Sequence, residues 1–556
     1  MVAGGAALRA DPERRPAPAR LSAMAACGRT RPRLGQGRRT MSGMNRAENR
    51  ARLERESFDV LVIGGGATGA GVALDAASRG LSVALVERDD FASGTSSRST
   101  KLVHGGVRYL DAAVMQRDRA QFHLVREALA ERAILLDIAP HLVHPLRTVV
   151  PAYTLRQAIF YRVGLWLYDR AAGAAAIGRS HFLSRAQMLA SFPRLKQRGL
   201  KGGVAYYDGQ FDDARMALAV LATAARESAL VVNRVEVVAL REAGGRLAGA
   251  YVRDRLDGRS FNVHARAVVN ATGPGSDAMR RMEHPEATPL LEPSRGTHLA
   301  LDRAWVPKGD GLLIPKTPDG RVLFLLPWQG GALAGTTDVA TAPSFDPEPT
   351  DAEIDYLLAQ LGEWLQPAPD RAAVCASWAG LRPLIAEAAT RTANIVREHH
   401  IEVGPKGLVT IAGGKWTTYR RMAEETVDRL VETAGLNAHS ACRTRELRLV
   451  GAEGFDEHLP QALATRHHLD ADIADHLAHA YGGLAEQLLE EAGAAGMRRL
   501  AADHPYIEAE VCWAQRHEMA ITAEDVLARR MRLAFLDARA ATEARPRVQA
   551  MLAGCG

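Results

Sequence analysis

The hydrophobic pattern is most distinct between residues 58 and 87, where two short apolar runs flank a helical stretch. The first run, Val60–Ile63, contains no polar residue and stops at three glycines, as expected of a strand buried on both faces in a parallel sheet. From residue 67 onward, apolar residues recur at helical spacing as far as Gly80, which stands where a helix C-cap is expected. A second apolar run, Val83–Val86, follows. The pattern therefore predicts a strand–helix–strand unit.

The turn after the first strand carries the glycine spacing of a dinucleotide-binding motif. Gly64, Gly66 and Gly69 read G-x-G-x-x-G, and Glu87 ends the second strand. Such glycines let the backbone approach a pyrophosphate held at the helix N-terminus, and the carboxylate takes the hydroxyls of an adenosine ribose. The alternative is a glycine-rich turn in an ordinary αβ unit. Such a turn does not require an acidic residue at the position of Glu87. We expect a dinucleotide-binding domain.

Elsewhere the pattern divides the chain into segments of different character. The first 56 residues are rich in Ala, Arg, Gly and Pro and lack apolar periodicity, which predicts a disordered N-terminal extension. A helix is expected over residues 214–227. Alternating residues at 322–326 predict an antiparallel strand with one buried face. From about residue 440, apolar residues recur every three or four positions, which predicts a helical domain over residues 440–556.

Composition excludes several classes of protein. No apolar run reaches the ~20 residues of a membrane-spanning helix, so any membrane contact would be peripheral. The 70 basic and 64 acidic residues interleave, so we expect no nucleic-acid partner. No C-x-x-C pair and no calcium-loop pattern occurs. We therefore expect a reduced compartment, no metal, and no disulfide framework among the five cysteines, Cys27, Cys375, Cys442, Cys512 and Cys555.

The extension bears on localisation. Its arginines resemble those of a mitochondrial transit peptide, but Asp11, Glu13 and several prolines argue against one. Met41 and Met44 offer later start sites, so an overlong gene model is at least as good an explanation. We expect the first 43 residues to be dispensable, and mitochondrial targeting is the less favoured reading.

A polar stretch follows the dinucleotide unit and carries a resemblance to a known family. Residues 91–110 read FASGTSSRSTKLVHGGVRYL, which is too polar for a core and too long for a plain connector. The stretch is similar to the flavin loop of FAD-dependent glycerol-3-phosphate dehydrogenases, S-S-x-S-x-K-L-x-H-G-G-x-R-Y-L. Further segments match the same family: VVNATG at 268–273, GTH at 296–298, GTTD at 335–338, GLRPL at 380–384, GGKWTTYR at 413–420 and the helical segment at 520–537.

This resemblance covers roughly residues 57–540 and implies an α/β fold. A Rossmann-like FAD-binding domain of the D-amino-acid-oxidase type would be discontinuous over 57–135, 205–290 and 375–435. An antiparallel-sheet substrate domain would occupy 136–204 and 291–374. Residues 440–556 would form a C-terminal helical cap.

FAD is the cofactor that the resemblance implies, held by residues of the matched motifs. The predicted FAD-binding residues are Gly64, Gly66, Gly69, Glu87, Thr95, Ser96, Ser97, Lys101, Gly105, Gly106, Gly273, Gly414, Thr417 and Thr418.

Oxidation of a secondary alcohol by hydride transfer to a flavin needs a base for the hydroxyl proton and cations for an anionic substrate. His104 is the candidate base on residue type and position, with His298 in reserve. Arg382 would bind the substrate phosphate and assist catalysis, since arginine binds phosphate through paired donors. The other predicted substrate-binding residues are Arg108, Tyr109, Thr337, Arg397 and Lys415.

Three functions remain open at this point. The favoured one is oxidation of sn-glycerol 3-phosphate to dihydroxyacetone phosphate, with electrons passed to a quinone. The others are an oxidase of the same fold that uses oxygen or an amine substrate, and a non-catalytic flavin-binding redox regulator. A homodimer is an option, because relatives are often dimers.

Residues 153–170 combine aromatic and basic positions and suit a lipid interface, although a core helix fits them equally well. The expected location is cytoplasmic, peripherally associated with the inner face of the cell membrane.

Overall fold

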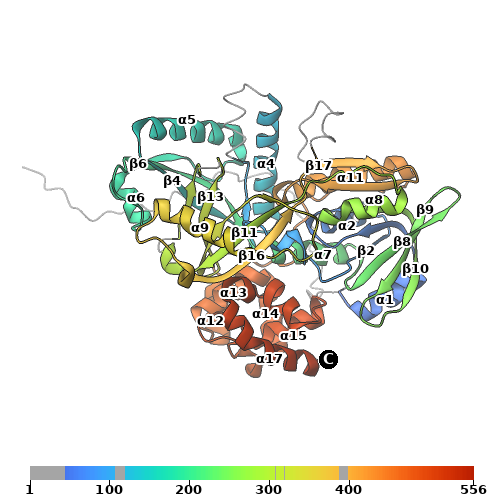
Figure 1. Cartoon of the computed structure of the whole chain (residues 1–556). Coiled ribbons are helices and arrows are strands. Elements are labelled where there is room, and N and C mark those ends of the chain that lie inside the picture. Colours follow the sequence, from blue (N-terminus) through green and yellow to red (C-terminus); the bar gives the residue numbers. More distant parts are fainter. Residues whose placement is uncertain (1–43, 107–118, 307–308, 318–319, 387–398, 556) are drawn as a thin grey trace, which may run out of the picture. The chain divides into compact units, whose positions relative to one another are not determined.

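The computed structural model describes residues 44–106, 119–306, 309–317, 320–386 and 399–555, and all of them belong to one compact unit, Met41–Gly556. Two large sheets and a set of C-terminal helices organise this unit (Figure 1). Each of the two apolar runs recognised in the sequence is a strand of the first sheet, so the strand–helix–strand prediction is confirmed.

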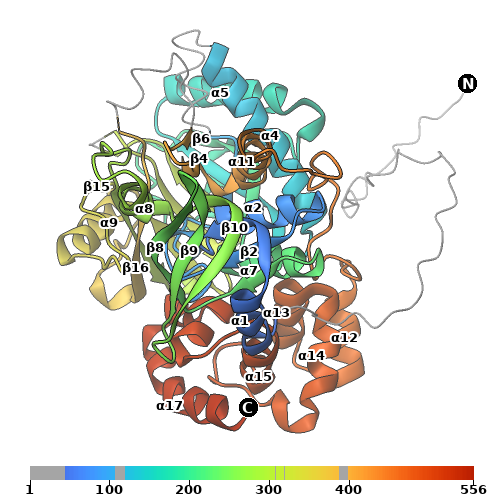
Figure 2. The ribbon, with the colours of Figure 1, turned by 90° about the vertical axis from the view of Figure 1, so that its right-hand side faces the viewer.

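The first sheet has the order β17-β18-β10-β1-β2-β7, with β8 and β9 continuing from β10. Its central strands β18, β10, β1, β2 and β7 run parallel. The bounds are β1 Ser57–Ile63, β2 Val83–Val86, β7 Leu230–Val232, β8 Val235–Ala243, β9 Arg246–Asp254, β10 Ser260–Asn270, β17 His399–Val403 and β18 Leu408–Gly413. Figure 2 shows β8, β9 and β10 side by side.

Helices α2 (Ala67–Ser78), α7 (Asp213–Arg226) and α11 (Tyr419–Ala434) pack together against this sheet, and α8 (Ser276–Glu283) contacts β18 and β8. Close packing at the start of α2 depends on glycine. Gly64 has φ +110°, and a Cβ on Gly69 would lie 1.9 Å from the Gly64 carbonyl oxygen. The helix can therefore approach the end of β1 only with glycine at both positions.

The second sheet has the order β15-β11-β14-β13-β12-β4-β6-β3, with β16 paired to β11 and β5 to β6. Its neighbours are antiparallel except for β12 and β4, so the substrate sheet is largely as predicted. The bounds are β3 Leu102–Val103, β4 Val143–Ala152, β5 His181–Ser184, β6 Gly202–Phe211, β11 Ser294–Leu301, β12 Gly311–Ile314, β13 Leu323–Trp328, β14 Gly331–Gly335, β15 Val339–Ala340 and β16 Val374–Arg382.

Two strands cross the predicted domain borders. β6 spans the border drawn at residue 204, and β16 pairs with β11 along its length although residues from 375 onward were assigned to the FAD domain. Helices α4 (Arg119–Ile138), α5 (Leu155–Ala172), α6 (Arg185–Ser191) and α9 (Asp351–Trp364) accompany this sheet.

The C-terminal helices gather as a separate layer (Figure 1). Their bounds are α12 Leu459–His467, α13 Ala471–Tyr481, α14 Ala485–Ala492, α15 Glu508–His517, the π-helical turn η9 Asp525–Arg530, α16 Leu533–Leu536 and α17 Ala538–Gly554. A hydrophobic cluster joins this layer to the second sheet through Trp328 and Trp378. Among the described residues, no helix is both long and apolar enough to cross a membrane.

Two expectations from the sequence are wrong. The prediction of disorder is wrong for residues 46–55, because α1 (Arg46–Arg55) is a helix that buries Leu53 and donates from Asn49 to the Val231 carbonyl (3.0 Å); residues 1–43 lie outside the described residues. The cysteines are not all free thiols either, because Cys512 and Cys555 form a disulfide between α15 and the residue after α17. Cys375 and Cys442 are free.

Candidate active site

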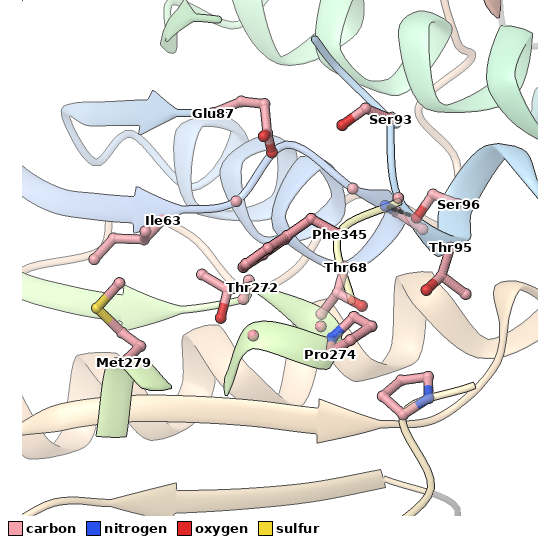
Figure 3. Close-up of a pocket in the computed structure, with 18 of the residues that line it drawn as sticks. Ile63, Thr68, Glu87, Ser93, Thr95, Ser96, Thr272, Pro274, Met279 and Phe345 are labelled. Carbon is pink, nitrogen blue, oxygen red and sulfur yellow. Dashed lines mark hydrogen bonds between the residues drawn. The ribbon is translucent and has the colours of Figure 1, made fainter. Parts of the chain in front are cut away.

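A cavity of about 390 Å³ lies at the carboxyl ends of β1, β2, β10 and β18 (Figure 3). Ligands bind at this edge of a parallel sheet because the loops diverge there and helix N-termini point toward it. Thr68, in the first turn of α2, lines the cavity, so the positive end of the helix dipole is available to an anion.

Glu87 stands at the end of β2 on the cavity wall. Its carboxylate accepts from the backbone N–H groups of Gly65 (2.7 Å) and Asp89 (2.8 Å), and burial raises the pKa of this group. These bonds fix the carboxylate beside the glycine turn. A carboxylate that can accept from ribose hydroxyls, a helix N-terminus that can donate to a pyrophosphate and a glycine-lined wall are what a dinucleotide needs, so the residues present fit FAD.

The loop after β2 forms another wall through the short helix η1 (Thr95–Ser97). The Thr95 hydroxyl donates to the Leu381 carbonyl (2.6 Å), and the Ser96 hydroxyl accepts from the Ala67 N–H (2.9 Å). The indole N–H of Trp416 donates to the Ser96 carbonyl (2.9 Å). Segments from three regions of the sequence thus hold the flavin-loop residues against the cavity.

Lys101 is not placed as the sequence predicted. Its ammonium group is fully buried beneath η1, where it bonds to the Ser97 carbonyl (2.8 Å) and to Asp213 (2.7 Å). Burial lowers the pKa of Lys101 to about 7, although the Asp213 charge opposes that shift. Lys101 therefore supports the flavin loop from below and does not contact the cavity.

The remaining predicted FAD residues fall into two groups. Those that line the cavity are Gly64, Gly66, Glu87, Thr95, Ser96, Gly273 and Gly414. Those that lie outside the cavity lining are Gly69, Ser97, Lys101, Gly105, Gly106, Thr417 and Thr418. Residues of the lining that sequence reasoning missed include Arg88, Val235, Val237, Thr272, Met279 and Phe345; Thr272 stands in the matched VVNATG segment, whereas no motif marks the other five and only the fold brings them here.

His104 is held by backbone and hydroxyl groups around it. Its backbone N–H donates to the Thr417 hydroxyl (3.1 Å), and its ring Nδ1 accepts from the Gly106 N–H (3.0 Å). Burial, with the nearby charges of Lys415 and Arg132, lowers the pKa of His104 to about 3. The ring is therefore neutral at ordinary pH, with its proton on Nε2.

Lys415 connects His104 to the FAD cavity. It lines that cavity directly before η6 (Trp416–Thr418), and the Thr418 hydroxyl donates to its carbonyl (3.3 Å). Its charge is close enough to act on the His104 ring. A cation and a neutral histidine thus adjoin the cofactor site at one end.

Arg382 ends β16, and its charge acts on His298; its neighbours Leu381 and Pro383 line the cavity, whereas Arg382 does not. Its guanidinium donates to the Thr337 carbonyl from two nitrogens (both 3.1 Å) and to the Thr336 hydroxyl (3.1 Å), and about a third of the side chain is exposed. His298 is buried, stacks on Trp378, and lies 2.9 Å from the Thr100 hydroxyl. Burial, together with the charges of Lys101 and Arg382, lowers the pKa of His298.

Thr337 does not present its hydroxyl to a ligand. That hydroxyl donates to Glu353 (2.9 Å) and accepts from the Thr297 N–H (2.9 Å), inside the substrate domain. The expectation that Thr337 donates directly to the substrate is therefore not supported by this geometry; its carbonyl accepts from Arg382. Arg108, Tyr109 and Arg397 lie outside the described residues.

Comparison with known proteins identifies the class. Residues 59–429 match the family model described as FAD dependent oxidoreductase, and residues 442–554 match the C-terminal domain of alpha-glycerophosphate oxidase. The protein is an oxidoreductase with FAD as its cofactor, and the predicted fold class and cofactor are confirmed.

Individual relatives identify the family. A probable mitochondrial glycerol-3-phosphate dehydrogenase of Caenorhabditis elegans is 48% identical over 504 residues, which cover 89% of this chain and 70% of the relative. The mitochondrial enzyme of Homo sapiens is 46% identical over 88% of this chain and 69% of its own length. Glycerol-3-phosphate dehydrogenase from Bacillus halodurans, solved with FAD, is 31% identical with a TM-score of 0.75, over 93% of this chain and 94% of that one. The chain belongs to the FAD-dependent glycerol-3-phosphate dehydrogenase family.

Proposed function

We propose that this enzyme oxidises sn-glycerol 3-phosphate to dihydroxyacetone phosphate and passes the electrons to a quinone. The observation that carries the proposal is the position of Lys415, which lines the FAD cavity and acts on His104. A phosphorylated alcohol needs a cation and a proton acceptor beside the flavin. The names of the relatives support glycerol 3-phosphate as the alcohol.

The reaction removes a proton from the substrate hydroxyl and a hydride from the carbon that bears it. FAD, when bound, supplies the hydride acceptor. Lys415 and Arg382 pair with the substrate phosphate, and His104 takes the hydroxyl proton. Since Nδ1 of His104 accepts from the Gly106 N–H, the substrate hydroxyl must replace that N–H as donor to Nδ1. His298 remains the reserve base.

Anaerobic addition of sn-glycerol 3-phosphate to the purified holoenzyme tests the substrate. We expect bleaching of the flavin absorbance by one equivalent of substrate, and no bleaching by glycerol or by an amino acid. Absence of bleaching by any of the three would favour a non-catalytic flavin-binding regulator. Bleaching by the amino acid alone would favour an amine oxidase.

Reoxidation of the bleached enzyme tests the acceptor. A water-soluble short-chain quinone should restore the absorbance at least about a hundred times faster than dissolved oxygen at the same concentration. Equal rates, with stoichiometric hydrogen peroxide, would identify an oxidase instead.

A quinone-reducing enzyme must meet a membrane, and α5 offers a surface for it. The capping box of Thr154 and Gln157 starts the helix, and one face packs inward through Leu165 and Tyr168. The opposite face exposes five large apolar side chains by 47–70%: Leu155, Ile159, Phe160, Val163 and Trp166. We propose that this face enters the lipid interface.

Basic residues complete the surface of α5. Arg156, Arg162 and Arg170 lie on the same helix, and the Arg170 guanidinium lies over the Trp166 ring (5.2 Å). Aromatic and basic side chains on one surface helix favour an anionic lipid surface.

Co-sedimentation with vesicles that contain phosphatidylglycerol tests this docking surface. The double substitution Val163→Glu, Trp166→Glu should abolish pelleting while leaving glycerol 3-phosphate turnover with a soluble quinone unchanged. A matched control replaces two exposed apolar residues elsewhere, Tyr251→Glu and Leu256→Glu, and should pellet as the wild type does. If the α5 variant pellets fully, the docking surface lies elsewhere.

Localisation and assembly stay predictions. Relatives from animals and Arabidopsis thaliana are mitochondrial by name, whereas the sequence favoured a cytoplasmic location at the inner face of the cell membrane. Fractionation of cells that express the full chain decides between the two compartments. Mass photometry of the purified enzyme tests the homodimer.

A further inference from the structure

A loop from the substrate domain reaches the FAD cavity. Residues 341–350 connect β15 to α9, and Ser344, Phe345 and Pro347 line the cavity. The Thr341 N–H donates to the Pro293 carbonyl (3.1 Å), and Thr350 caps α9 at the other end. Three prolines within the loop fix their own φ angles, so this span, which we call the strap, is stiffer than most loops of its length.

Phe345 is the residue through which the strap contacts the walls of the cavity. Its ring lies under the Arg88 guanidinium, 3.8 Å from the ring centroid, and Arg88 directly follows Glu87. On the other side, a Cβ on Gly275 would lie 3.4 Å from the Phe345 ring. One side chain therefore touches both walls of the cavity, at the end marked by Glu87; in Figure 3 it lies between Glu87 and Pro274.

Folding does not explain this position. Phe345 is 56% exposed and belongs to none of the hydrophobic clusters of the described residues. A half-exposed aromatic ring contributes little burial to the folded state. The ring is nevertheless held at the cavity wall, by Arg88 on one side and next to Gly275 on the other.

Arg98 fastens the strap to the flavin loop. It follows η1 and donates to the Pro347 carbonyl (3.1 Å) and to the Asp346 carboxylate (2.8 Å). The same guanidinium donates to the Ala379 carbonyl of β16 (3.1 Å), so Arg98 itself is anchored in the substrate sheet. Asp346 is largely exposed, which makes its ion pair the weakest link in the fastening.

We propose that the strap is the gate of the FAD site, with Phe345 as the lid over its adenosine end and the Arg98–Asp346 pair as the latch. FAD enters and leaves only when Phe345 swings away from Arg88 and Gly275. The gate sets the rate of exchange of the cofactor, and it does so whatever substrate the enzyme oxidises.

A lid and a simple contact residue differ in their kinetics. Removing a contact raises the rate of FAD release alone, whereas removing a lid lowers one barrier that both directions share. Phe345→Ala should therefore raise both the association and the release rate constants about tenfold and change the Kd less than about threefold. Phe345→Trp, a larger lid, should lower both rate constants.

Quenching of flavin fluorescence measures both rates. Apoenzyme mixed with FAD gives the association rate, and holoenzyme diluted into excess 8-chloro-FAD gives the release rate. Far-UV circular dichroism verifies folding, and Phe182→Ala serves as the control because Phe182 is similarly exposed on β5 and does not line the cavity. Unchanged rates in both Phe345 variants, or a rise in release alone, would overturn the proposal.

The latch has its own test. Asp346→Asn should raise both rate constants by up to about fivefold, the range of an exposed ion pair. In the double variant with Phe345→Ala, the Asp346→Asn effect should disappear, because the latch acts only through the lid. If the two effects instead multiply, the latch and the lid are independent and the gate is wrong.

Discussion

Lys101 offers the sharpest test of how the flavin loop is supported. Replacing it by methionine keeps most of the side-chain volume and removes the charge. In the structure its ammonium lies 2.7 Å from Asp213 and 2.8 Å from the Ser97 carbonyl, with no exposed surface. At an effective dielectric constant near 20, the pair attracts by about 6 kcal/mol, and desolvation of the two ions offsets several kcal/mol of that.

The loss in free energy of unfolding caused by Lys101→Met depends on the hydrogen bonds and ion pairs that Asp213 retains. Breaking a buried pair costs about 3–5 kcal/mol when the partner is stranded. Asp213 retains Arg532 (3.1 Å) and the hydroxyl and N–H of Ser99 (2.7 and 2.9 Å). We therefore expect a loss of about 2–3 kcal/mol. For the unit Met41–Gly556, with an unfolding entropy of about 1 kcal/mol/K, this lowers Tm by about 2–3 °C near pH 6.5.

The same variant should show a pH dependence. Burial lowers the Lys101 pKa to about 7, against about 10.4 in the unfolded chain. Between these values the unfolded state binds one more proton at Lys101 than the folded state, so this group's contribution to wild-type stability rises by about 1.4 kcal/mol per pH unit. Lys101→Met lacks that rise, so its deficit should grow to roughly 5 °C at pH 9.

Thermal melts of the holoenzyme at a fixed scan rate, followed by flavin fluorescence, measure these deficits. Lys201→Met, at an exposed lysine, is the control and should melt within about 0.5 °C of the wild type at both pH values. An equal deficit at pH 6.5 and 9 would mean that Lys101 stays charged in the folded enzyme. No deficit at all would refute the energetic argument for the pair.

Three further predictions concern substrate, base and N-terminus. Arg382→Ala should raise the KM for glycerol 3-phosphate at least about tenfold with FAD retained, because loss of one cation from a phosphate site costs about 2–5 kcal/mol; an unchanged KM contradicts this. His104→Gln should reduce its flavin about 10²–10⁴-fold more slowly in stopped flow with near-normal affinity, and a wild-type rate would transfer the role to His298. A chain started at Met44 should bind FAD and turn over normally. A chain started at Ser57 lacks α1 and should melt about 2–4 °C lower; equal Tm values would show that α1 adds nothing to the stability of the fold.

Local pattern was sufficient to predict the cofactor-binding unit. The apolar periodicity and the glycine turn of the β1–α2–β2 unit lie within 30 residues. The lengths of its strands and helix place Glu87 at the end of β2, beside the glycine turn. Alternation at residues 322–326 predicted one strand of the antiparallel substrate sheet, and the extent of that domain came from the family resemblance. The signals of the cofactor-binding unit are short-range, so that unit could be predicted without tertiary information.

Features that depend on distant partners could not be predicted. α1 contributes few buried residues, so its polar sequence resembles that of a disordered segment until β7 and β10 are placed beside it. Cys512 and Cys555 meet only because α17 packs on α15. Phe345 reaches the FAD cavity because β15 ends at that side of the substrate sheet, which no motif near residue 345 encodes.

Motif membership also misled the assignment of Lys101, and the reason concerns the C-terminal domain. Lys101 stands in the flavin loop, so a cofactor role was natural, but its φ of +63° turns the side chain under η1. There it shares the Ser97 carbonyl with Arg532, which donates to the same oxygen (2.6 Å). Arg530 also contacts the loop that follows β2. Its guanidinium donates to the Asp90 carboxylate (3.0 Å).

These arginines connect the C-terminal helices to the loop after β2, part of which lines the FAD cavity. Removing the domain would take Arg530 from Asp90 and Arg532 from Asp213, leaving Asp213 with Lys101 and Ser99 and Asp90 with Asn233, and a buried carboxylate that loses its arginine is costly. The abundance of arginine, which in the sequence resembles compositional drift, is at these positions a structural requirement. Arginine serves here because one guanidinium can bond a carboxylate and a backbone carbonyl at once, as Arg532 does with Asp213 and Ser97.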